Sequence, residues 1–193
     1  MRIETERLTL RPFRDADADE FAHLAGDWAV ASMTSDIPYP FSPREAAGWL
    51  APARGEVRYA IEREGHLMGG VGFYRKSSGV AELGFWLGRR WWHQGYATEA
   101  ARAVLAQGAR NRRLPGFSSA HFVDNPASAR VLLKLGFEPM GSASIACAAR
   151  GRDVEAVIYW LDRAQARRHL PAQAGGEASR GRWRAWLGRS RPA

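Results

Sequence analysis

The chain has 193 residues, of which 46% are hydrophobic and 25% charged, the size and balance of one globular domain. The apolar content, with eight tryptophans and eight phenylalanines, excludes a chain that is disordered throughout. A single cysteine, Cys147, excludes an internal disulfide framework and a cysteine-based zinc site, and no metal is expected. No apolar stretch reaches the roughly 18 residues that a membrane helix needs, so we expect a cytoplasmic protein without a membrane anchor.

The net charge of +8 is concentrated at the C-terminal end. All but two of the 28 basic residues are arginines, and residues 166–193 hold seven of them against one acid, Glu177. The first 165 residues are therefore nearly neutral, which disfavours a nucleic-acid-binding domain, because such domains spread basic residues over a folded face. We expect one domain over residues 1–165 and a basic, disordered tail over residues 166–193.

Hydrophobic periodicity and turn signals predict a mixed α/β domain. The predicted elements, in chain order, are a strand over 3–11, a helix over 15–25, a loop over 32–41, a helix over 43–50, strands over 57–63, 66–75 and 80–88, a helix over 96–111, a strand over 116–123, a helix over 126–135, and a closing pair of strands over 138–149 and 154–161. Ser42 and Glu45 have the spacing of a capping box, and Glu64-Gly65 is typical of a two-residue hairpin turn. This order predicts a central, mostly antiparallel sheet flanked by helices.

The segment with the clearest chemical signal runs from the strand over 80–88 into the helix that starts at Tyr96. The first main-chain amides of a helix have no partner inside it, and the helix dipole places partial positive charge there, so such a start suits an anion such as pyrophosphate. Gly95 removes the side chain where a phosphate must approach the backbone, and Ala97 keeps the next contact small. On these grounds alone the signal is weak, because a glycine before a helix is more often a simple joint between loop and helix than a phosphate site.

The same segment resembles the acyl-CoA pyrophosphate loop of the GNAT superfamily of N-acetyltransferases. It is most similar to the branch that contains the ribosomal-protein alanine N-acetyltransferases. Further pieces agree in order and spacing: Thr5-Glu6-Arg7-Leu8-Thr9-Leu10-Arg11-Pro12, the helix Asn125-Pro126-Ala127-Ser128 through Gly136-Phe137, and the final strand pair. The resemblance covers about residues 2–162 and implies the GNAT fold, with a V-shaped slot for the cofactor between two splayed strands.

One position departs from the superfamily pattern. The pattern has Gln or Arg, two residues, Gly, one residue, then Gly or Ala. Gly95 and Ala97 fit it, but Trp92 occupies the Gln/Arg position. This puts a side-chain phosphate contact from residue 92 in doubt and leaves the backbone, His93 and neighbouring arginines.

The resemblance implies a direct transfer of an acetyl group from acetyl-CoA, as co-substrate, to a primary amine in a ternary complex. The cofactor-binding residues that it implies are Phe85, Trp86, Leu87, Trp92, His93, Gln94, Gly95, Tyr96, Ala97, Thr98 and Asn125. Gly84 and Gly88 are expected either to permit close approach and a bulge along that strand or only to relieve packing.

Three residues are candidates for catalysis. Ser128 is the candidate general acid for the leaving thiolate, or a first-turn serine that satisfies backbone groups. Asn125 is expected to contact the pantetheine or thioester region, to cap the helix, or both. Glu82 is a candidate base acting through water, with a surface ion pair to an arginine as the alternative; His121 could serve instead, although a strand histidine is usually structural. Cys147 is expected to be a packed hydrophobe.

The acceptor amine is left open by the sequence. Residues 32–41, the capped helix after them and the loop 150–153 are expected to set specificity, with Tyr39, Phe41 and Trp49 either as an aromatic wall or as anchors of the loop. The candidates are a protein N-terminus and a small-molecule amine, including a drug. A different class is an idle acyl-CoA-binding module whose basic tail contacts RNA or the ribosome. Either a monomer or a homodimer is compatible with the sequence.

Overall fold

A computed structural model describes residues 2–50 and 55–170 of the chain. In chain order its elements are β1 (Ile3–Glu4), β2 (Thr9–Arg11), η1 (Asp15–Asp17), α1 (Ala18–Ala25), α2 (Trp28–Ala31), α3 (Pro43–Leu50), β3 (Glu56–Arg63), β4 (His66–Arg75), β5 (Ala81–Leu87), η2 (Arg89–Trp91), α4 (Tyr96–Gly108), β6 (Gly116–Phe122), α5 (Pro126–Lys134), β7 (Glu138–Cys147), β8 (Arg152–Asp162) and α6 (Arg163–His169).

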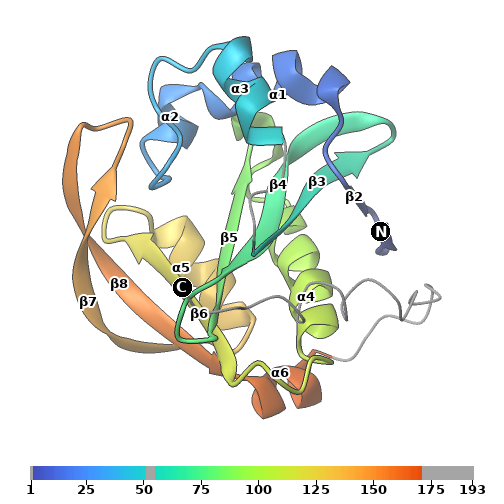
Figure 1. Cartoon of the computed structure of the whole chain (residues 1–193), viewed down its shortest axis with the longest axis vertical. Helices are drawn as coiled ribbons and strands as arrows, with labels where there is room; N and C mark the ends of the chain where they lie inside the picture. The colour runs from blue at the N-terminus through green and yellow to red at the C-terminus, as the bar shows by residue number, and fades with distance from the viewer. Residues whose placement is uncertain (1, 51–54, 171–193) are drawn as a thin grey trace, which may run out of the picture.

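Within the described residues, eight strands form one sheet in the order β1-β2-β3-β4-β5-β6-β8-β7 (Figure 1). Neighbouring strands run antiparallel, except that β5 and β6 run parallel. The capping box of Ser42 and Glu45 at α3 and the two-residue turn at Glu64-Gly65 form as predicted. The predicted α/β class with a mostly antiparallel sheet is confirmed.

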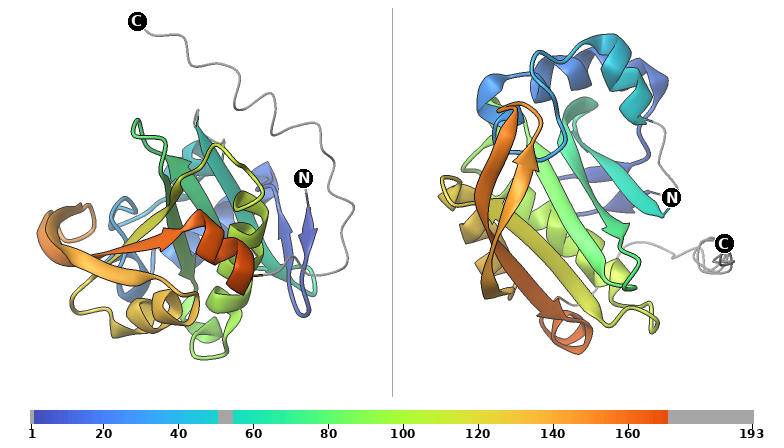
Figure 2. Two further views of the ribbon diagram at one scale, coloured as in Figure 1. Left: turned by 90° about the horizontal axis from the view of Figure 1, so that it is seen from below. Right: turned by 60° about the vertical axis from the view of Figure 1, so that its left-hand side comes forward.

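Helices cover both faces of this sheet, so its strands bury side chains on two sides (Figure 2). Helices α4 and α5 pack over a core that contains Leu83 and Phe117, whereas α1, α2 and α3 pack over a second core around Phe21. On β3, Ile61 belongs to the first core and its neighbour Ala60 to the second, because successive side chains of a strand point to opposite faces.

The sheet is interrupted at its parallel pair. β5 and β6 are in register only at Ala81 with Phe117 and at Glu82 with Ser118. Where this ladder ends, the hydroxyl of Ser119 donates a hydrogen bond of 3.0 Å to the carbonyl of Leu83. Beyond that point, among residues 2–50 and 55–170, the main chain of β5 has no strand partner on its β6 side, although buried backbone groups are nearly always paired in folded proteins.

The first predicted strand is not continuous. Residues 3–11 form two short strands, β1 and β2, which pair with each other across a turn. The amide of Thr5 donates to the carbonyl of Leu8, and the amide of Leu8 donates to the hydroxyl of Thr5. This local hydrogen bonding competes with extended structure, so period-two alternation alone gave the wrong element here.

Two further differences from the sequence prediction concern a missed helix and the expected domain boundary. Helix α2 was not predicted, because its four residues are too few for helical periodicity; the side chain of Asp27 caps it by accepting from the amide of Ala29. The expected domain boundary at residue 165 falls inside α6, where Ala166 and Leu170 are buried in the main core. The remainder of the expected tail, residues 171–193, lies outside the described residues.

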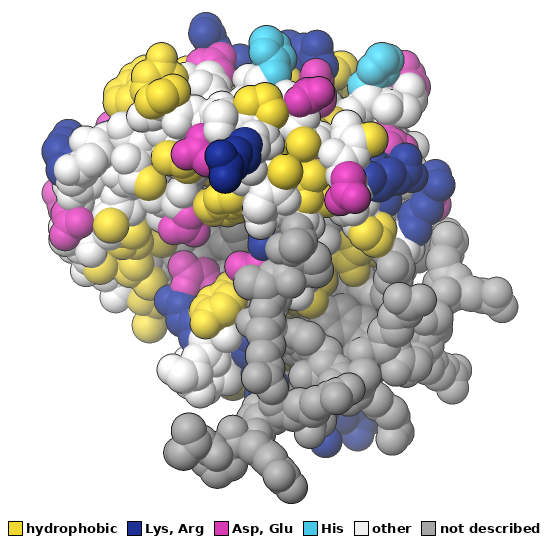
Figure 3. Space-filling view, turned by 45° about the horizontal axis from the view of Figure 1, so that its top comes forward, with side chains coloured by type: hydrophobic (Ala, Val, Ile, Leu, Met, Phe, Trp, Pro, Cys, Tyr) yellow, Lys and Arg dark blue, Asp and Glu magenta, His cyan; other side chains and the backbone are white. Residues whose placement is uncertain are grey.

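Acidic and basic side chains are interspersed on the face over α1 and α3 (Figure 3). This mixture agrees with the near-neutral charge of the first 165 residues. Among the described residues, no helix is both long and apolar enough to cross a membrane.

A buried ionic cluster ties β2 to η1 and β3. Arg11 donates to both carboxylate oxygens of Asp17, at 2.7 and 2.8 Å, and also pairs with Glu62. The side chains of Arg11 and Asp17 are only 5% and 9% exposed, so each charge depends on the other for its solvation. Burial raises the pKa of Asp17, but hydrogen bonds from Arg11 and from the amide of Arg14 outweigh it and leave that pKa below its usual value.

We predict that Arg11→Met lowers the free energy of unfolding by about 3–5 kcal/mol, because two carboxylates are then buried without their cation. Folding favours the ionised form of Asp17, so its contribution is present above about pH 3.9 and is lost as the pH falls through the lower folded pKa. Urea titrations at pH 7 and pH 3 measure both effects. The matched control is Arg90→Met, which removes an exposed pair with Glu20 and should cost at most ~1 kcal/mol. Equal losses in the two variants would contradict the prediction.

Candidate active site

A tight turn connects β5 to α4. The single turn η2 leads to Trp92, and the chain then reverses through His93 and Gly95, which both have positive φ, 62° and 82°. A left-handed conformation costs a non-glycine residue free energy, so Gly95 is the residue suited to the last position before the helix. Residues 93–95 are exposed, so the outer surface of this turn is open to a ligand.

The start of α4 has unpaired main-chain amides. Gly95 is the N-cap and supplies no side-chain hydrogen bond, and the first intrahelical bond runs from the amide of Glu99 to the carbonyl of Gly95, at 3.0 Å. The amides of Tyr96, Ala97 and Thr98 therefore have no partner inside the helix, and the helix dipole adds partial positive charge. Backbone of this kind fits a pyrophosphate.

Trp92 packs with its indole toward the protein. Its ring lies against the main core, and its Nε1 donates a hydrogen bond of 2.7 Å to the carbonyl of Leu87. Tryptophan has one donor, so this side chain has none left for a phosphate. Residue 92 therefore fixes the turn from the inside.

The free edge of β5 faces β6 beyond the point where the two strands separate. The carbonyl of Leu83 points toward β6, and the carbonyl of Leu87 accepts a hydrogen bond from Trp92. Backbone groups alternate between the two edges of a strand, so those of Phe85, which is two residues from each, point to this same β6-facing edge. Gly84 is exposed in mid-strand, and a Cβ added to it would meet no atom within 4 Å. The side chain of Trp86 lies on the same face of the sheet as the open position at Gly84 and is stacked on Phe21, with ring centroids 5.0 Å apart, whereas Phe85 packs against the core on the other face. Gly88 packs closely on Leu24 instead of facing open space.

Asn125 and Ser128 meet at the start of α5. Asn125 follows β6 and caps the helix, since its side-chain oxygen accepts from the amide of Ser128 at 3.1 Å. The capping role that the sequence allowed is confirmed. Ser128 is partly buried, and within the described part of the chain its hydroxyl makes no hydrogen bond.

The other candidate residues are in structural contacts. Glu82 forms a surface ion pair, as the alternative interpretation proposed, but its partner is Lys76 and not an arginine. His121 is buried, with Nδ1 2.7 Å from the carbonyl of Phe122 and Nε2 3.3 Å from the hydroxyl of Tyr159. Cys147 is buried as a free thiol in a small apolar cluster.

The expected acceptor side is built by residues 32–41 and the β7–β8 turn. The amide of Ala148 donates to the carbonyl of Ser35 at 2.8 Å, and Arg150 donates to the carbonyl of Ser32 at 2.8 Å. Arg150 also binds Asp124, at 2.7 Å, and this hydrogen bond lowers the pKa of that carboxyl. One arginine therefore connects this loop to the residue before Asn125, a link that the sequence did not indicate.

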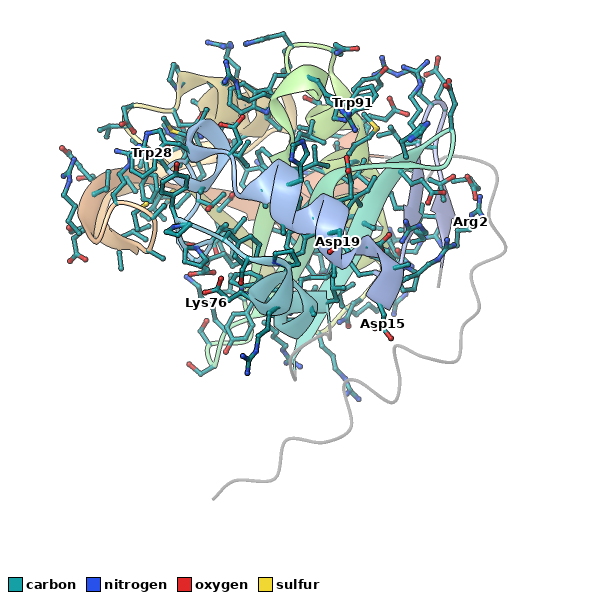
Figure 4. All side chains as sticks on the ribbon, turned by 90° about the horizontal axis from the view of Figure 1, so that it is seen from above. Arg2, Asp15, Asp19, Trp28, Lys76 and Trp91 are labelled. Carbon is teal, nitrogen blue, oxygen red and sulfur yellow. The ribbon has the colours of Figure 1, made fainter. Side chains whose placement is uncertain are left out.

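Aromatic side chains follow the same loop. Tyr39 and Trp28 are both half exposed, and their rings pack edge to face with centroids 5.1 Å apart. Phe41 is buried and packs on Phe21 and Trp49. Of the three predicted aromatics, Phe41 thus anchors the loop and Tyr39 lies on its surface. Trp28, on the missed helix α2, lies on the side of the helical layer next to the β7–β8 hairpin (Figure 4).

Among the described residues, no group of three or more His, Cys, Asp or Glu side chains could hold a metal ion.

Residues 7–138 match the acetyltransferase (GNAT) domain family. The chain is 32% identical over 149 residues to the uncharacterized N-acetyltransferase YoaA of Bacillus subtilis, covering 72% of this chain and 84% of that protein. Its fold is similar to the microcin C7 self-immunity acetyltransferase MccE in complex with acetyl-CoA and AMP, with a TM-score of 0.72, 18% identity, and 81% and 93% of the two chains covered. It is equally similar to the ribosomal L7/L12 alpha-N-protein acetyltransferase RimL in complex with coenzyme A, with a TM-score of 0.72, 19% identity, and 84% and 98% covered.

We predict that Asn125→Ala lowers the free energy of unfolding by about 1 kcal/mol, because the amide of Ser128 loses its cap. Asn125→Asp keeps an oxygen acceptor at the same place and should retain wild-type stability within ~0.5 kcal/mol. Urea unfolding measures both variants. A loss in Asn125→Asp as large as in Asn125→Ala would show that the amide nitrogen, not the capping oxygen, carries the contribution.

Proposed function

This chain belongs to the GNAT acetyltransferase family and uses acetyl-CoA as acetyl donor, and we propose that it acetylates a primary amine by direct attack in a ternary complex. The observation that supports this most is the pair of unpaired backbone surfaces, the free edge of β5 and the start of α4. The first suits the amide-rich pantetheine arm, and the second suits the pyrophosphate.

In this proposal the residues from Trp92 to Thr98 hold the pyrophosphate through main-chain amides, with Trp92 shaping the turn. Phe85, Trp86 and Leu87 line the arm, and the amide of Phe85 is the donor that stabilises the oxyanion on the thioester carbon. Gly84 keeps the neighbouring space open. Asn125 contributes to the same region from the opposite strand end.

The chemistry forms a carbon–nitrogen bond and breaks the carbon–sulfur bond of the thioester. The attacking amine must be neutral, and it loses one proton as the amide forms; Glu82, through water, is the proposed acceptor of that proton. Glu82 lies near the start of β5, where its carboxylate pairs with Lys76. In this proposal a chain of water molecules carries the proton from the amine to that carboxylate. The departing thiolate takes a proton from Ser128, whose hydroxyl is not engaged elsewhere in the described residues and regains its proton from solvent.

We further propose that the acceptor enters on the side of Trp28, Tyr39 and the β7–β8 turn, where half-exposed aromatics suit an apolar group beside the amine. The free, buried thiol of Cys147 supports a location in the reducing cytoplasm.

Protein N-termini and small-molecule amines both fit the proposed acceptor side. An acceptor screen with N-terminal peptides and small amines, in which the release of free thiol is measured, separates these two classes of acceptor. Acetyl-CoA binding without turnover on the whole panel would instead support an idle binding module.

Gly95→Glu is predicted to abolish acetyl-CoA binding, because a bulky anion then occupies the proposed phosphate position at φ 82°. Calorimetry with acetyl-CoA measures the change, and a thermal melt confirms that the variant is folded. Gly151→Glu, at a positive-φ glycine in the β7–β8 turn, is the control for backbone strain. Wild-type affinity in folded Gly95→Glu would refute the phosphate assignment.

Ser128→Ala is predicted to lower kcat by a factor on the order of 10²–10⁴ while the Kd for acetyl-CoA changes little, because the lost group acts on the leaving thiolate. Steady-state kinetics and calorimetry on one preparation give both numbers. An unchanged kcat would make Ser128 a first-turn structural residue and would move the acid role to an ordered water.

A further inference from the structure

The turn between β1 and β2 reaches across to the start of α4. The carboxylate of Glu99, in the first turn of that helix, accepts three hydrogen bonds from this turn. The donors are the hydroxyl of Thr5 at 2.6 Å, the amide of Arg7 at 2.8 Å and the Nε of Arg7 at 2.7 Å. The proposed phosphate loop is thereby joined to a segment more than 90 positions away in the chain.

Arg7 also holds the loop itself. Its Nη1 donates to the carbonyl of Gln94 at 3.1 Å, and its guanidinium lies over the ring of Tyr96, 4.5 Å from the centroid. A Cβ added to Gly95 would lie 3.4 Å from its Nη2. One side chain therefore contacts the residues on both sides of Gly95 and the helix one turn later. The fork geometry of the guanidinium makes these contacts simultaneous.

The electrostatic situation of Glu99 gives Arg7 a second role. The side chain of Glu99 is 11% exposed; burial raises its pKa, but the hydrogen bonds from Thr5 and Arg7 outweigh this and lower it below the usual value. An ionised carboxylate in the first turn of α4 would repel a bound pyrophosphate, because few water molecules screen it. The charge of Arg7, 2.7 Å away, cancels that repulsion.

The loop lacks a polar side chain of its own at the position where the superfamily pattern has Gln or Arg. Trp92 stands there, and its single donor is used on Leu87. The arginine that lies against the loop comes from the β1–β2 turn instead.

We propose that Arg7 is a positioning residue of the acetyl-CoA site: it holds the turn around Gly95 in its binding conformation and cancels the charge of Glu99. The inference rests on the proposed assignment of this loop to the pyrophosphate. Arg7 acts on the phosphate-bearing end of the donor and not on the thioester, which separates it from a residue that only stabilises the fold.

The test compares two donors, acetyl-CoA and S-acetylpantetheine, which carries the same thioester without any phosphate. In Arg7→Met the KM for acetyl-CoA should rise about tenfold, whereas the KM for S-acetylpantetheine should change less than twofold. Arg7→Lys, which keeps the charge but loses the fork, should give an intermediate rise. Arg2→Met is the matched control: Arg2 directly precedes β1 at the outer edge of the molecule and pairs with Glu4 (Figure 4), and both KM values should stay at wild type.

A second substitution separates the two roles of Arg7. Adding Glu99→Gln to Arg7→Met removes the uncompensated carboxylate. The KM for acetyl-CoA should then be about threefold lower than in Arg7→Met alone. The remaining defect then measures the loss of the bond to Gln94 and of the contact with Tyr96.

Equal rises in KM for the two donors, or a wild-type acetyl-CoA KM in folded Arg7→Met, would overturn the proposal. Gly95→Glu distinguishes this failure from a failure of the loop assignment. If Gly95→Glu abolishes acetyl-CoA binding and Arg7→Met leaves it intact, only the role of Arg7 is wrong. If Gly95→Glu binds normally, the loop assignment is wrong, and the inference about Arg7 is overturned with it.

Discussion

The separation of β5 from β6 is the constraint on which the rest of the site depends. Two parallel strands in the middle of the sheet share only two register pairs, and in the part of the chain that the structure describes the edge of β5 beyond Glu82 is left without a strand partner. Unpaired backbone is costly where water is excluded, so such an edge persists only if the surroundings hold the strands apart. Here β5 is fixed on its other side by a ladder of seven pairs with β4, and β6 by seven with β8. The two halves of the sheet are each complete, and the free edge lies between them.

The start of α4 repeats the same principle at a second place. Helix ends leave amides unpaired, and side-chain caps usually satisfy one of them. Gly95 offers no cap, whereas Asn125 at α5 and Asp162 at α6 do. Helix α1 also begins without a side-chain cap, but it continues directly from η1, whereas α4 follows a turn whose residues 93–95 are exposed. A main-chain site of this kind tolerates sequence change around it, which explains why Trp92 is compatible with the family's loop.

Local signals made much of this architecture predictable, and non-local contacts account for what was missed. The glycine before α4, the Asn-Pro start of α5 and the hairpin at Glu64 are set by neighbouring residues, and all three form as expected. The alternation over residues 3–11 misled, because the turn at Thr5 is held both by its own hydrogen bonds with Leu8 and by Glu99 on a distant helix. The contacts of Arg7 with Gln94 and of Arg150 with Ser32 had no sequence signal, since each joins segments more than 80 residues apart. The roles of Ser128 and Glu82 remain predictions, because their chemistry requires substrates.

The acceptor side is coupled to the donor side through Arg150. This arginine is 11% exposed, joins the carbonyl of Ser32 to Asp124, and lies over the ring of Phe122 at the end of β6. Residues 32–35 therefore follow the position of the strand end that carries Asn125. In contrast, Trp28 and Tyr39 are half exposed and pack mainly on each other. If the acceptor enters on this side, as proposed, a change at these two aromatics is expected to alter its binding without disturbing the sheet, whereas a change at Arg150 is expected to move the loop and the strand end together.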